Sequence, residues 1–436
     1  MEKSVAFYTL GCKVNQYETE AVIEIFQKDG YKILDFKDFA DIYIINTCTV
    51  TSVSDKKSRQ MIRRARQKNK NALIIMMGCY SQVSQDEAEK LTQVDIIIGS
   101  TGKNKVLEYI KEFKPENGKK VYIEDLNKNK EYDDMSISTY KENTRAYIKI
   151  QDGCDRYCSY CIIPFARGKV RSRNYESVIN EVETLGKEGF KEIILTGIHL
   201  ASYGKERNDI TLIGLIKKID QVSGIERIRL SSLEPLIIDR KFVEFAKTNE
   251  KLCKHFHLSL QSGSDNVLKL MNRRYTTFDY LEKVKLLKEN LPGVSLTTDL
   301  IVGFPGETDE DLIQTAKFIK SVGFLKVHVF KFSERKGTKA AKLKNKVNSL
   351  TKDTRSKKII EISDNMSIEF RKKFLGERMS IIVEQNLSTD SDYLVGFTEN
   401  YIKVIFKGDF KKYKGKLCNV ELIKINDDFV EGCIIN

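Results

Sequence analysis

Between Arg145 and Ser333, strand-like apolar runs alternate six times with helix-like segments. The six runs are Ala146–Gln151, Glu192–Thr196, Arg227–Ser231, His255–Leu260, Ser295–Val302 and Lys326–Phe332. Strands joined through helices pair in parallel, because each helix returns the chain to the same end of the sheet. Six consecutive βα units therefore predict a barrel-like parallel sheet, open or closed.

Two further regions flank this repeat. The first hundred residues show a shorter βα rhythm, which predicts a small parallel sheet with strands at Val5–Thr9, Ile42–Asn46, Leu73–Met77 and Val94–Ile98. Residues 114–143 are polar and predict a linker or irregular crossover. Beyond a basic, mostly helical segment, short strands punctuated by glycines predict a small β-barrel, at Met379–Glu384, Tyr393–Thr398, Ile402–Phe406 and Asn419–Ile425.

The composition narrows the classes of protein. A chain of 436 residues with 41% hydrophobic residues is long enough for several packed domains. No apolar run reaches about 18 residues and no signal-peptide core opens the sequence, so we expect no membrane segment and a cytosolic protein. The net charge of +13 favours a polyanionic partner such as nucleic acid, although many basic proteins bind nothing anionic.

Nine cysteines in a protein expected in a reducing compartment favour metal binding or catalysis over disulfides. Cys154, Cys158 and Cys161 form a C-x3-C-x2-C motif directly after the first strand of the six-unit region. Three thiolates on one loop can bind three irons of a [4Fe–4S] cluster and leave the fourth iron free to bind a cofactor. The alternative is a zinc site, but zinc normally takes a fourth Cys or His, and none lies nearby in the sequence.

Cys12, Cys48 and Cys79 each follow one of the first three predicted strands. Because the carboxyl ends of parallel strands meet at one edge of a sheet, these three thiols can converge and hold a second cluster. The alternative is three buried core cysteines, which would more often fall inside strands. Cys253, Cys418 and Cys433 have no companion at ligand spacing, and we interpret them as structural.

The chain resembles the radical S-adenosylmethionine (SAM) methylthiotransferases, and the resemblance covers essentially its whole length. It is carried by the two cysteine sets in this order and by several short motifs, which are Gly153–Cys161, Ile163-Pro164, Arg167-Gly168, Arg171-Ser172-Arg173, Leu195-Thr196-Gly197, Ser231–Pro235, Gln261–Ser264, Met271–Tyr275, Asp299–Glu307 and Phe332-Ser333 with Arg335 and Gly337-Thr338. Within the family, Thr9–Glu18 is similar to the branch that acts on threonylcarbamoyladenosine in tRNA. Two other branches act on isopentenyl-adenosine in tRNA and on a ribosomal protein, and they typically differ from Lys13-Val14 after the first cysteine.

The resemblance implies an α/β protein of three domains. These are a flavodoxin-like methylthiotransferase domain at 2–115, a partial (βα)6 radical SAM barrel at 140–370 and a TRAM-like β-barrel at 372–436. It also implies two [4Fe–4S] clusters, SAM, and transfer of a methylthio group to adenine C2 at tRNA position 37. The C2–H bond is neither acidic nor readily attacked by a nucleophile, so replacing this hydrogen with sulfur calls for a radical. The second cluster would then be the place from which sulfur is delivered.

The same resemblance suggests where SAM binds. Glu234, Gln261 and Asp299 lie at or near strand ends that hold the ribose, amino and carboxylate groups of SAM in other radical SAM enzymes. Arg273 suits the SAM carboxylate, because a guanidinium can bond both oxygens. Gly197 is also expected to line the SAM site. Gly303, with the turn at Gly306, would let the backbone approach the adenine of SAM. Each polar residue taken alone could instead be an ordinary rim side chain, and His257 receives no role.

The expected partners are the anticodon stem-loop of tRNA and an electron donor such as flavodoxin or ferredoxin. One candidate RNA surface is the basic cluster Lys56, Lys57, Arg59, Arg63, Arg64, Arg66, Lys68 and Lys70, and a second is the Lys- and Arg-rich segment from Arg335 to Lys373. Either could be an ordinary solvated surface. The C-terminal region has balanced charge, so any RNA binding there would need shape, a few lysines and aromatics such as Tyr393, Phe397, Tyr401 and Phe410. A rival of another class is a non-catalytic iron–sulfur protein that binds RNA.

Overall fold

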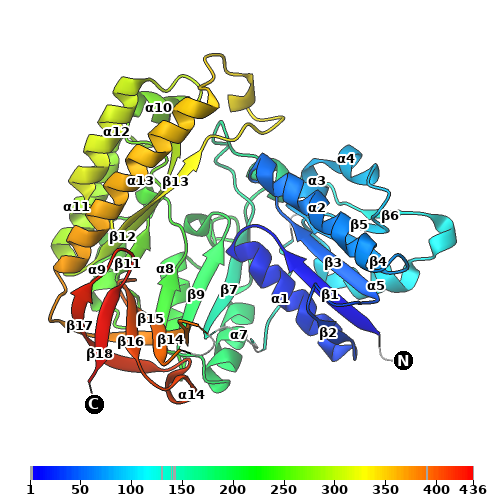
Figure 1. The fold of residues 1–436 in the computed structure, drawn as a ribbon, viewed down its shortest axis with the longest axis horizontal. Helices are drawn as coiled ribbons and strands as arrows, with labels where there is room; N and C mark the ends of the chain where they lie inside the picture. The colour runs from blue at the N-terminus through cyan, green and yellow to red at the C-terminus, as the bar shows by residue number, and fades with distance from the viewer. Residues whose placement is uncertain (1–2, 129–130, 139, 141–143, 389–390, 436) are drawn as a thin grey trace.

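The computed structural model describes residues 3–128, 131–138, 140, 144–388 and 391–435. Figure 1 shows three parts in chain order, which are an N-terminal α/β part, a central barrel-like part and a small C-terminal barrel. Among the described residues, no helix is long and apolar enough to cross a membrane. The expected domain limits at residues 2 and 436 fall outside the described residues, and the three domain ranges stay a prediction.

The N-terminal part is a parallel sheet of six strands in the order β2-β1-β3-β4-β5-β6. The strands are β1 (Ser4–Thr9), β2 (Lys32–Leu34), β3 (Ile42–Thr47), β4 (Leu73–Gly78), β5 (Ile96–Ile98) and β6 (Lys120–Tyr122). Helices α1 (Lys13–Lys28) and α5 (Val106–Glu112) cover one face, and α2 (Ser52–Lys68), α3 (Cys79–Val83) and α4 (Gln85–Glu89) lie on the other. The central strand β3 is wholly buried, as a strand covered on both faces must be.

The predicted βα rhythm of this part is confirmed, with two additions. β2 and β6 were not predicted, because each has only three residues and lies at an edge of the sheet, where no long apolar run is needed. β6 also falls in the segment 114–143 that was predicted as a linker or crossover, so that interpretation is wrong for Lys120–Tyr122. Residues 129–130, 139 and 141–143 of that segment lie outside the described residues.

The central part confirms six parallel strands of a partial barrel. They are β7 (Arg145–Asp152), β9 (Glu192–Gly197), β10 (Arg227–Leu230), β11 (His255–His257), β12 (Ser295–Val302) and β13 (Lys326–Lys331). β8 (Arg171–Ser172) adds a short antiparallel strand beside β7. Isolated bridges, Ile228 with Leu252 and Leu233 with Leu258, join β10 to the β11 side. Among the described residues no pairing returns from β13 to β7 or β8, so the barrel is open.

Helices surround this barrel on its outside, and its inner surface is polar. The helices are α6 (Ile163–Arg167), α7 (Tyr175–Lys187), α8 (Leu212–Asp220), α9 (Arg240–Thr248), α10 (Asp265–Leu270), α11 (Thr277–Asn290), α12 (Asp309–Val322) and α13 (Ser349–Lys372). Ala146, Ile148 and Ile150 of β7 pack in the main hydrophobic core. Because side chains alternate along a strand, Tyr147 and Lys149 point to the opposite, inner face.

The C-terminal part is a closed barrel of five strands, as the sequence predicts for its class. Its strands are β14 (Arg378–Asn386), β15 (Tyr393–Thr398), β16 (Lys403–Lys407), β17 (Leu417–Ile425) and β18 (Val430–Ile434), with α14 (Phe410–Tyr413) between β16 and β17. β18 was not predicted. In Figure 1 this small barrel lies beneath the central strands, at the end of α13.

The small barrel is anchored to the amino-terminal ends of the central strands. The Tyr401 ring stacks on the His255 ring at 4.5 Å, and Arg229 lies over the same tyrosine. Arg227 donates to the carbonyls of Ser380 at 2.6 Å and Phe397 at 3.2 Å. Phe397 and Tyr401, two of the aromatics named for possible RNA binding, pack against arginines of the central barrel. The carboxyl ends of the central strands, where ligands bind in such sheets, stay uncovered by this domain.

Candidate functional site

The first three cysteines lie on the loop between β7 and α6. Gly153 begins the loop with φ of +74°, and a side chain there would overlap the carbonyl oxygen of Lys169. The Cys154 N–H donates to the Gly168 carbonyl at 2.9 Å, and the Cys161 N–H donates to the Cys158 carbonyl at 3.0 Å. The loop is thus closed on itself and held against the chain that follows it.

Ser159 fixes the middle of this loop to the rest of the barrel. Its N–H donates to the Met271 carbonyl at 3.0 Å, and its hydroxyl donates to the Leu270 carbonyl at 2.7 Å. Its own carbonyl accepts from the Ala340 N–H at 2.7 Å. Three contacts at one residue hold the cysteines in place at the end of β7.

The second three cysteines come from separate strands and meet at one edge of the N-terminal sheet. Cys12 caps α1 after β1, Cys48 follows β3, and Cys79 begins α3 after β4. A side chain on Gly11 would come within 2.9 Å of the Cys48 Cβ, so glycine is required where these segments meet. The structure thus places the three predicted ligands beside one another, although 31 residues or more separate them in the sequence.

Burial favours the protonated thiol at Cys48, Cys79, Cys154 and Cys161, because it raises the pKa of each. It raises the pKa of Cys48 to about 11, and the neighbouring Cys79 and Cys12 thiols contribute to the rise. On the first loop, burial raises the pKa of Cys154 to about 11 and that of Cys161 to about 12, with Cys158 adding to both. Metal ligands must be thiolates, so iron binding would displace protons from these sites.

The arrangement fits clusters better than single metal ions. Among the described residues, no three His, Cys, Asp or Glu side chains are placed to bind one ion, as a zinc site would require. Each thiolate of a [4Fe–4S] cluster bonds a different iron, so its ligands need not converge on one atom. Three cysteines per site also leave one iron of each cluster without a protein ligand.

Arg273 and Glu234, two of the residues expected to bind SAM, lie beside the first cysteine loop. Arg273 Nη1 is 3.3 Å from Cys158 Sγ, and its guanidinium lies 4.8 Å from the centre of the Tyr275 ring. Glu234 accepts a hydrogen bond from Arg156 and lies 3.2 Å from His199 Nε2. Arg156 and His199 were missed in the sequence, where only the place of Arg156 between two cysteine ligands could have signalled it.

Gln261 and Asp299 occupy the inner side of the barrel. Gln261 has φ of +71°, and its N–H donates to the Asp299 carbonyl at 2.9 Å. The Asp299 carboxylate lies 3.3 Å from His257 Nε2. The strained backbone at Gln261 is typical of residues that present a functional group, since such conformations cluster at ligand sites.

Gly197 and Gly303 are less open than expected. The space beside Gly197 is taken by Gln151, whose Cβ lies 3.0 Å from where a glycine side chain would begin. The corresponding space at Gly303 is filled by Lys352, and the Gly303 N–H donates to Glu307 Oε2 at 2.6 Å. Protein side chains therefore occupy the space on the Cβ side of both glycines.

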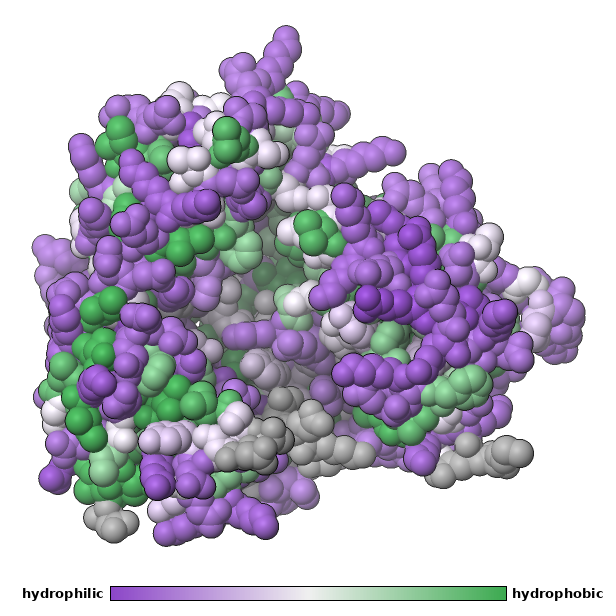
Figure 2. Space-filling model, in the orientation of Figure 1, coloured by the Kyte–Doolittle hydropathy of each residue, from purple (hydrophilic) through white to green (hydrophobic). Residues whose placement is uncertain are grey.

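The edge that carries Cys12, Cys48 and Cys79 faces the central barrel. Arg335 spans the boundary and donates from Nη2 to Thr49 and to Asp55, each at 2.6 Å. Between α3, α6 and the loop at Arg335 is a cavity of about 650 Å³. Figure 2 shows this face of the molecule hollowed between the N-terminal part and the barrel. Ile162, next to Cys161, and Gln82, three residues after Cys79, both line this cavity, so the two cysteine sites adjoin one interdomain region.

Exposed aromatic and basic residues lie around this region. Tyr157 and Phe165 are 48% and 52% exposed, and their rings meet edge to face at 6.4 Å. Figure 2 shows hydrophilic residues over α2. The exposed members of the predicted basic cluster are Lys56, Lys57, Arg63, Arg64, Lys68 and Lys70. Arg59 and Arg66 instead bond Tyr80 and Asp95.

The basic segment Arg335–Lys373 is only partly a free surface. Arg335, Arg355 and Arg371 are buried, and each makes hydrogen bonds within the protein. The α13 lysines Lys357 and Lys358 remain exposed. Lys336, Lys339, Lys342, Lys344, Lys346, Lys372 and Lys373 are exposed as well, so both predicted basic surfaces keep exposed cations.

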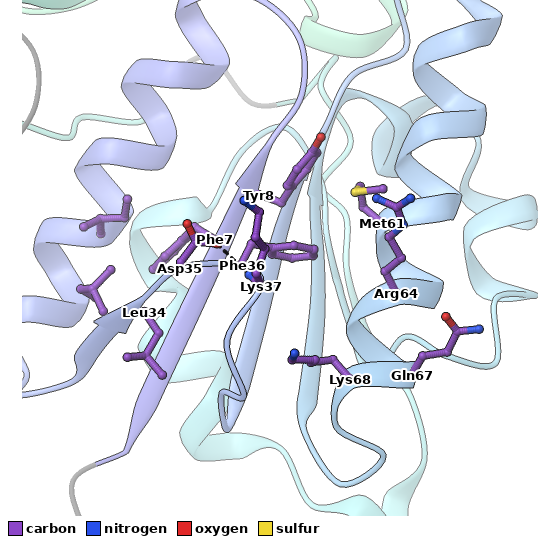
Figure 3. Close-up of a pocket in the computed structure, with 12 residues that line it drawn as sticks. Phe7, Tyr8, Leu34, Asp35, Phe36, Lys37, Met61, Arg64, Gln67 and Lys68 are labelled. Carbon is purple, nitrogen blue, oxygen red and sulfur yellow. Dashed lines mark hydrogen bonds between the residues drawn. The ribbon is translucent and has the colours of Figure 1, made fainter. Parts of the chain in front are cut away.

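A groove of about 910 Å³ lies elsewhere, at the β1 and β2 edge of the N-terminal sheet. Figure 3 shows Tyr8 and Phe36 between the strand edge and α2, with Arg64 and Lys68 at the rim. No cysteine and none of the predicted SAM residues lines this groove. This groove is therefore separate from the two cysteine sites and from the residues expected to bind SAM.

The other predicted assignments can also be placed. Cys253 is buried, whereas Cys418 and Cys433 lie in strands of the C-terminal barrel. None of the three has a described contact with the six clustered cysteines. His257 lies between Thr297, at 3.0 Å from its Nδ1, and Asp299.

Comparisons with known proteins agree with this geometry. Residues 148–319 match the Radical SAM superfamily, and residues 4–99 match an uncharacterised protein family, UPF0004. The chain is 41% identical over 432 residues to the threonylcarbamoyladenosine tRNA methylthiotransferase MtaB of Bacillus subtilis, covering 98% of this chain and 96% of that one. It is 39% identical to the protein of that name from Aquifex aeolicus, over 95% of this chain and 99% of the relative.

Among solved structures, the fold is similar to that of a radical SAM methyltransferase from Kitasatospora setae, solved with cobalamin and a [4Fe–4S] cluster. The TM-score is 0.59 at 15% identity, and the match covers 78% of this chain and 77% of the other. At this identity the likeness supports the fold alone, which is the α/β radical SAM architecture that the sequence predicts.

Proposed function

Because the chain belongs to the radical SAM methylthiotransferases, in the group that acts on threonylcarbamoyladenosine in tRNA, we propose how its residues perform this reaction. The reaction converts N6-threonylcarbamoyladenosine at tRNA position 37 to its 2-methylthio derivative. The observation that carries the proposal is the pair of three-cysteine sites that adjoin one interdomain region. A single such site would suffice for radical chemistry without sulfur insertion.

We assign Cys154, Cys158 and Cys161 to the cluster that binds SAM, and Cys12, Cys48 and Cys79 to the cluster that delivers sulfur. When bound, the clusters and SAM supply the radical and the sulfur that substitution at adenine C2 requires. The chain's own residues hold these groups in place. Arg273 lies next to Cys158, where its guanidinium can pair with the carboxylate of SAM.

Glu234, Gln261 and Asp299 would complete the SAM site. Glu234 is already oriented by Arg156 and His199, so its carboxylate is fixed before any ligand arrives. Gln261 and Asp299 lie further along the inner face of the barrel and would bond polar groups of the same ligand. Gly197 and Gly303 would serve as backbone positions, with Lys352 moving to admit adenine at Gly303.

Lys13 provides a place for the carboxylate of the substrate's threonyl group. It directly follows Cys12, and its ammonium lies 5.8 Å from the centre of the Tyr147 ring on the inner face of β7. Among the described residues, no carboxylate lies within ion-pair distance of this ammonium. A cation with no carboxylate partner among the described residues, beside the sulfur-delivering site, suits an anionic substituent on the adenosine.

The proposed partners follow from the same region. Tyr157 and Phe165 can stack on unpaired bases of the anticodon stem-loop, and the exposed lysines and arginines of α2 can neutralise its phosphates. A one-electron donor such as flavodoxin or ferredoxin would reduce the first cluster, in the cytoplasm where tRNA is modified. The C-terminal barrel, which we assign as TRAM-like, would contribute RNA contacts only through residues outside its anchored surface.

Two other substrates and one non-catalytic role can be distinguished from the proposed function. The chain is also 35% identical to a tRNA-2-methylthio-N(6)-dimethylallyladenosine synthase of Clostridium novyi, so an isopentenyl-type adenosine is the nearest alternative. A ribosomal protein carries no threonylcarbamoyl carboxylate for Lys13 to bind. A non-catalytic iron–sulfur protein would bind RNA but never cleave SAM.

The test is mass spectrometry of tRNA nucleosides from a deletion strain. We expect the 2-methylthio mark on threonylcarbamoyladenosine to disappear and to return with the wild-type chain. A variant with Cys12, Cys48 and Cys79 all changed to Ala should not restore it. Persistence of the mark in the deletion strain, or loss only of the isopentenyl-type mark, would refute the assignment.

A further inference from the structure

Arg167 connects the two cysteine sites directly. It ends α6, six residues after Cys161 in the sequence, and its side chain is fully buried. From there it crosses to the N-terminal domain, where its Nε lies 3.1 Å from Cys79 Sγ. Its Nη2 donates to Asn15 Oδ1 at 2.8 Å, next to the helix turn that carries Cys12. A residue of the first cysteine segment thus contacts a ligand of the second site.

The guanidinium belongs to a buried ionic network between the two domains. Glu18 of α1 accepts from Arg167 and Lys103, and from Lys149 of β7 at 2.8 Å. Asp152 at the end of β7 accepts from Lys149 at 2.6 Å and from Arg167 at 3.2 Å. Every one of these side chains is buried.

This network carries more positive than negative charge. The cations are Lys103, Lys149, Arg167 and Arg171, and the carboxylates are Glu18 and Asp152. The difference, four minus two, is +2, and it is +1 when Asp133, which accepts from the Lys103 N–H, is counted as ionised. Buried charge without a counterion is unfavourable. An iron–sulfur cluster on three thiolates is anionic and would supply the missing charge at Cys79.

We propose that Arg167 is a positioning residue for the cluster at Cys12, Cys48 and Cys79, which it orients through Cys79 and holds at a raised reduction potential. The inference rests on the proposed function, because it requires that these cysteines hold a cluster. A hydrogen bond to a ligand sulfur and a nearby positive charge both favour the more electron-rich form of a cluster. Arg167 thereby makes cluster properties depend on contact between the two domains.

Arg173 offers a matched control within the same chain. It is also fully buried, lies six residues further on, and bonds Tyr17 Oη at 3.1 Å as well as Glu181. Like Arg167 it joins the two domains, but it has no described contact with a cysteine. Loss of a buried interdomain arginine is therefore common to both variants, and loss of the Cys79 contact is specific to one.

The experiment uses the full-length chain with Cys154, Cys158 and Cys161 changed to Ala, so that only the second cluster remains. After anaerobic reconstitution, its reduction is followed by electron paramagnetic resonance at set potentials. We expect Arg167→Met to lower the ratio of reduced to oxidised cluster about tenfold at one potential, a shift of about 59 mV for one electron. Arg173→Met should leave the ratio unchanged.

Each outcome decides a separate point. If the background variant binds no iron, the assignment of Cys12, Cys48 and Cys79 fails, and the inference fails with it. If it binds iron but Arg167→Met does not shift the potential, or Arg173→Met shifts it equally, the inference is overturned and the function stands. If Arg167→Met binds no iron, Arg167→Lys decides. Iron binding restored by lysine supports a role of the charge, and no restoration overturns it.

Discussion

Cys154, Cys158 and Cys161 share one loop, whereas Cys12, Cys48 and Cys79 come from the ends of three strands. The first site is built by local backbone geometry, through the positive φ of Gly153 and the hydrogen bonds of Ser159. The second depends on the register of a parallel sheet and on a buried ionic contact with the neighbouring domain. The two sites should therefore fail for different reasons.

The largest effect is expected from removing the carboxylate of Glu18, which lies between the two domains. This change should affect the second cysteine site and not the first. Glu18→Gln leaves Lys103, Lys149 and Arg167 with too few counterions, and breaking such a buried pair costs about 3–5 kcal/mol of folding free energy. We expect lower stability in urea and loss of iron from the second site alone. Asp353→Asn is the control, since its ion pair with Lys331 is half-exposed and screened by solvent. Equal destabilisation by both changes would contradict the account.

A change at Gly153 should disrupt the first cysteine site and leave the second intact. Gly153→Ala forces a side chain against the Lys169 carbonyl at a positive φ, which costs about 1–3 kcal/mol and opens the loop. Iron content should fall by about four per chain, which is one cluster. Gly189→Ala has a similar positive φ but no atom within 4 Å, so it should keep all its iron. Retention of both clusters by Gly153→Ala would show that the loop is more adaptable than its geometry indicates.

A third change tests whether Lys13, between the two cysteine sites, recognises the substrate. Lys13→Met should reduce kcat/KM on tRNA with threonylcarbamoyladenosine about 10- to 100-fold, because a hydrogen bond between charged groups contributes about 1.5–3 kcal/mol. Iron content should not change. Lys28→Met, on the same helix but 70% exposed and paired with Glu24, should keep full activity. An unchanged kcat/KM for Lys13→Met would exclude it from substrate recognition.

The smallest expected effect concerns the outer surface of the first loop. Tyr157→Ala and Phe165→Ala should each weaken tRNA binding by about 1–3 kcal/mol if one base stacks on each ring. Filter binding at fixed salt measures this, with Phe39→Ala, a 64% exposed ring on the N-terminal domain, as the control. Equal affinities for tRNA in all three variants would show that the RNA contact lies away from this loop.

Much of the fold could be predicted because its signals are local. Six apolar runs alternating with helix-like segments predicted the strands of the central barrel, and the C-x3-C-x2-C spacing marked the first site. The short strands β2, β6 and β18 were missed, since three to five partly exposed residues give no periodic signal. Convergence of Cys12, Cys48 and Cys79 could be predicted only through the rule that parallel strands end at one edge.

The contacts that join the domains could not be predicted. Arg167 and Cys79 are 88 residues apart in the sequence, and nothing in the composition around either residue indicates the other. Tyr401 resembled an RNA-binding aromatic, yet it anchors the C-terminal barrel to His255 and Arg229. Residue propensity and motif spacing predict individual helices and strands. Contacts between domains depend instead on how the folded domains pack together.

The central claim is that one chain holds two independent clusters, and iron and sulfide analysis after anaerobic reconstitution tests it most directly. The wild-type chain should bind about eight irons, and each triple Cys→Ala variant, at Cys154, Cys158 and Cys161 or at Cys12, Cys48 and Cys79, about four. About four irons in the wild type, falling to none without the first cysteine set, would contradict the claim. The second set would then hold no cluster, and sulfur insertion by this site would have to be abandoned.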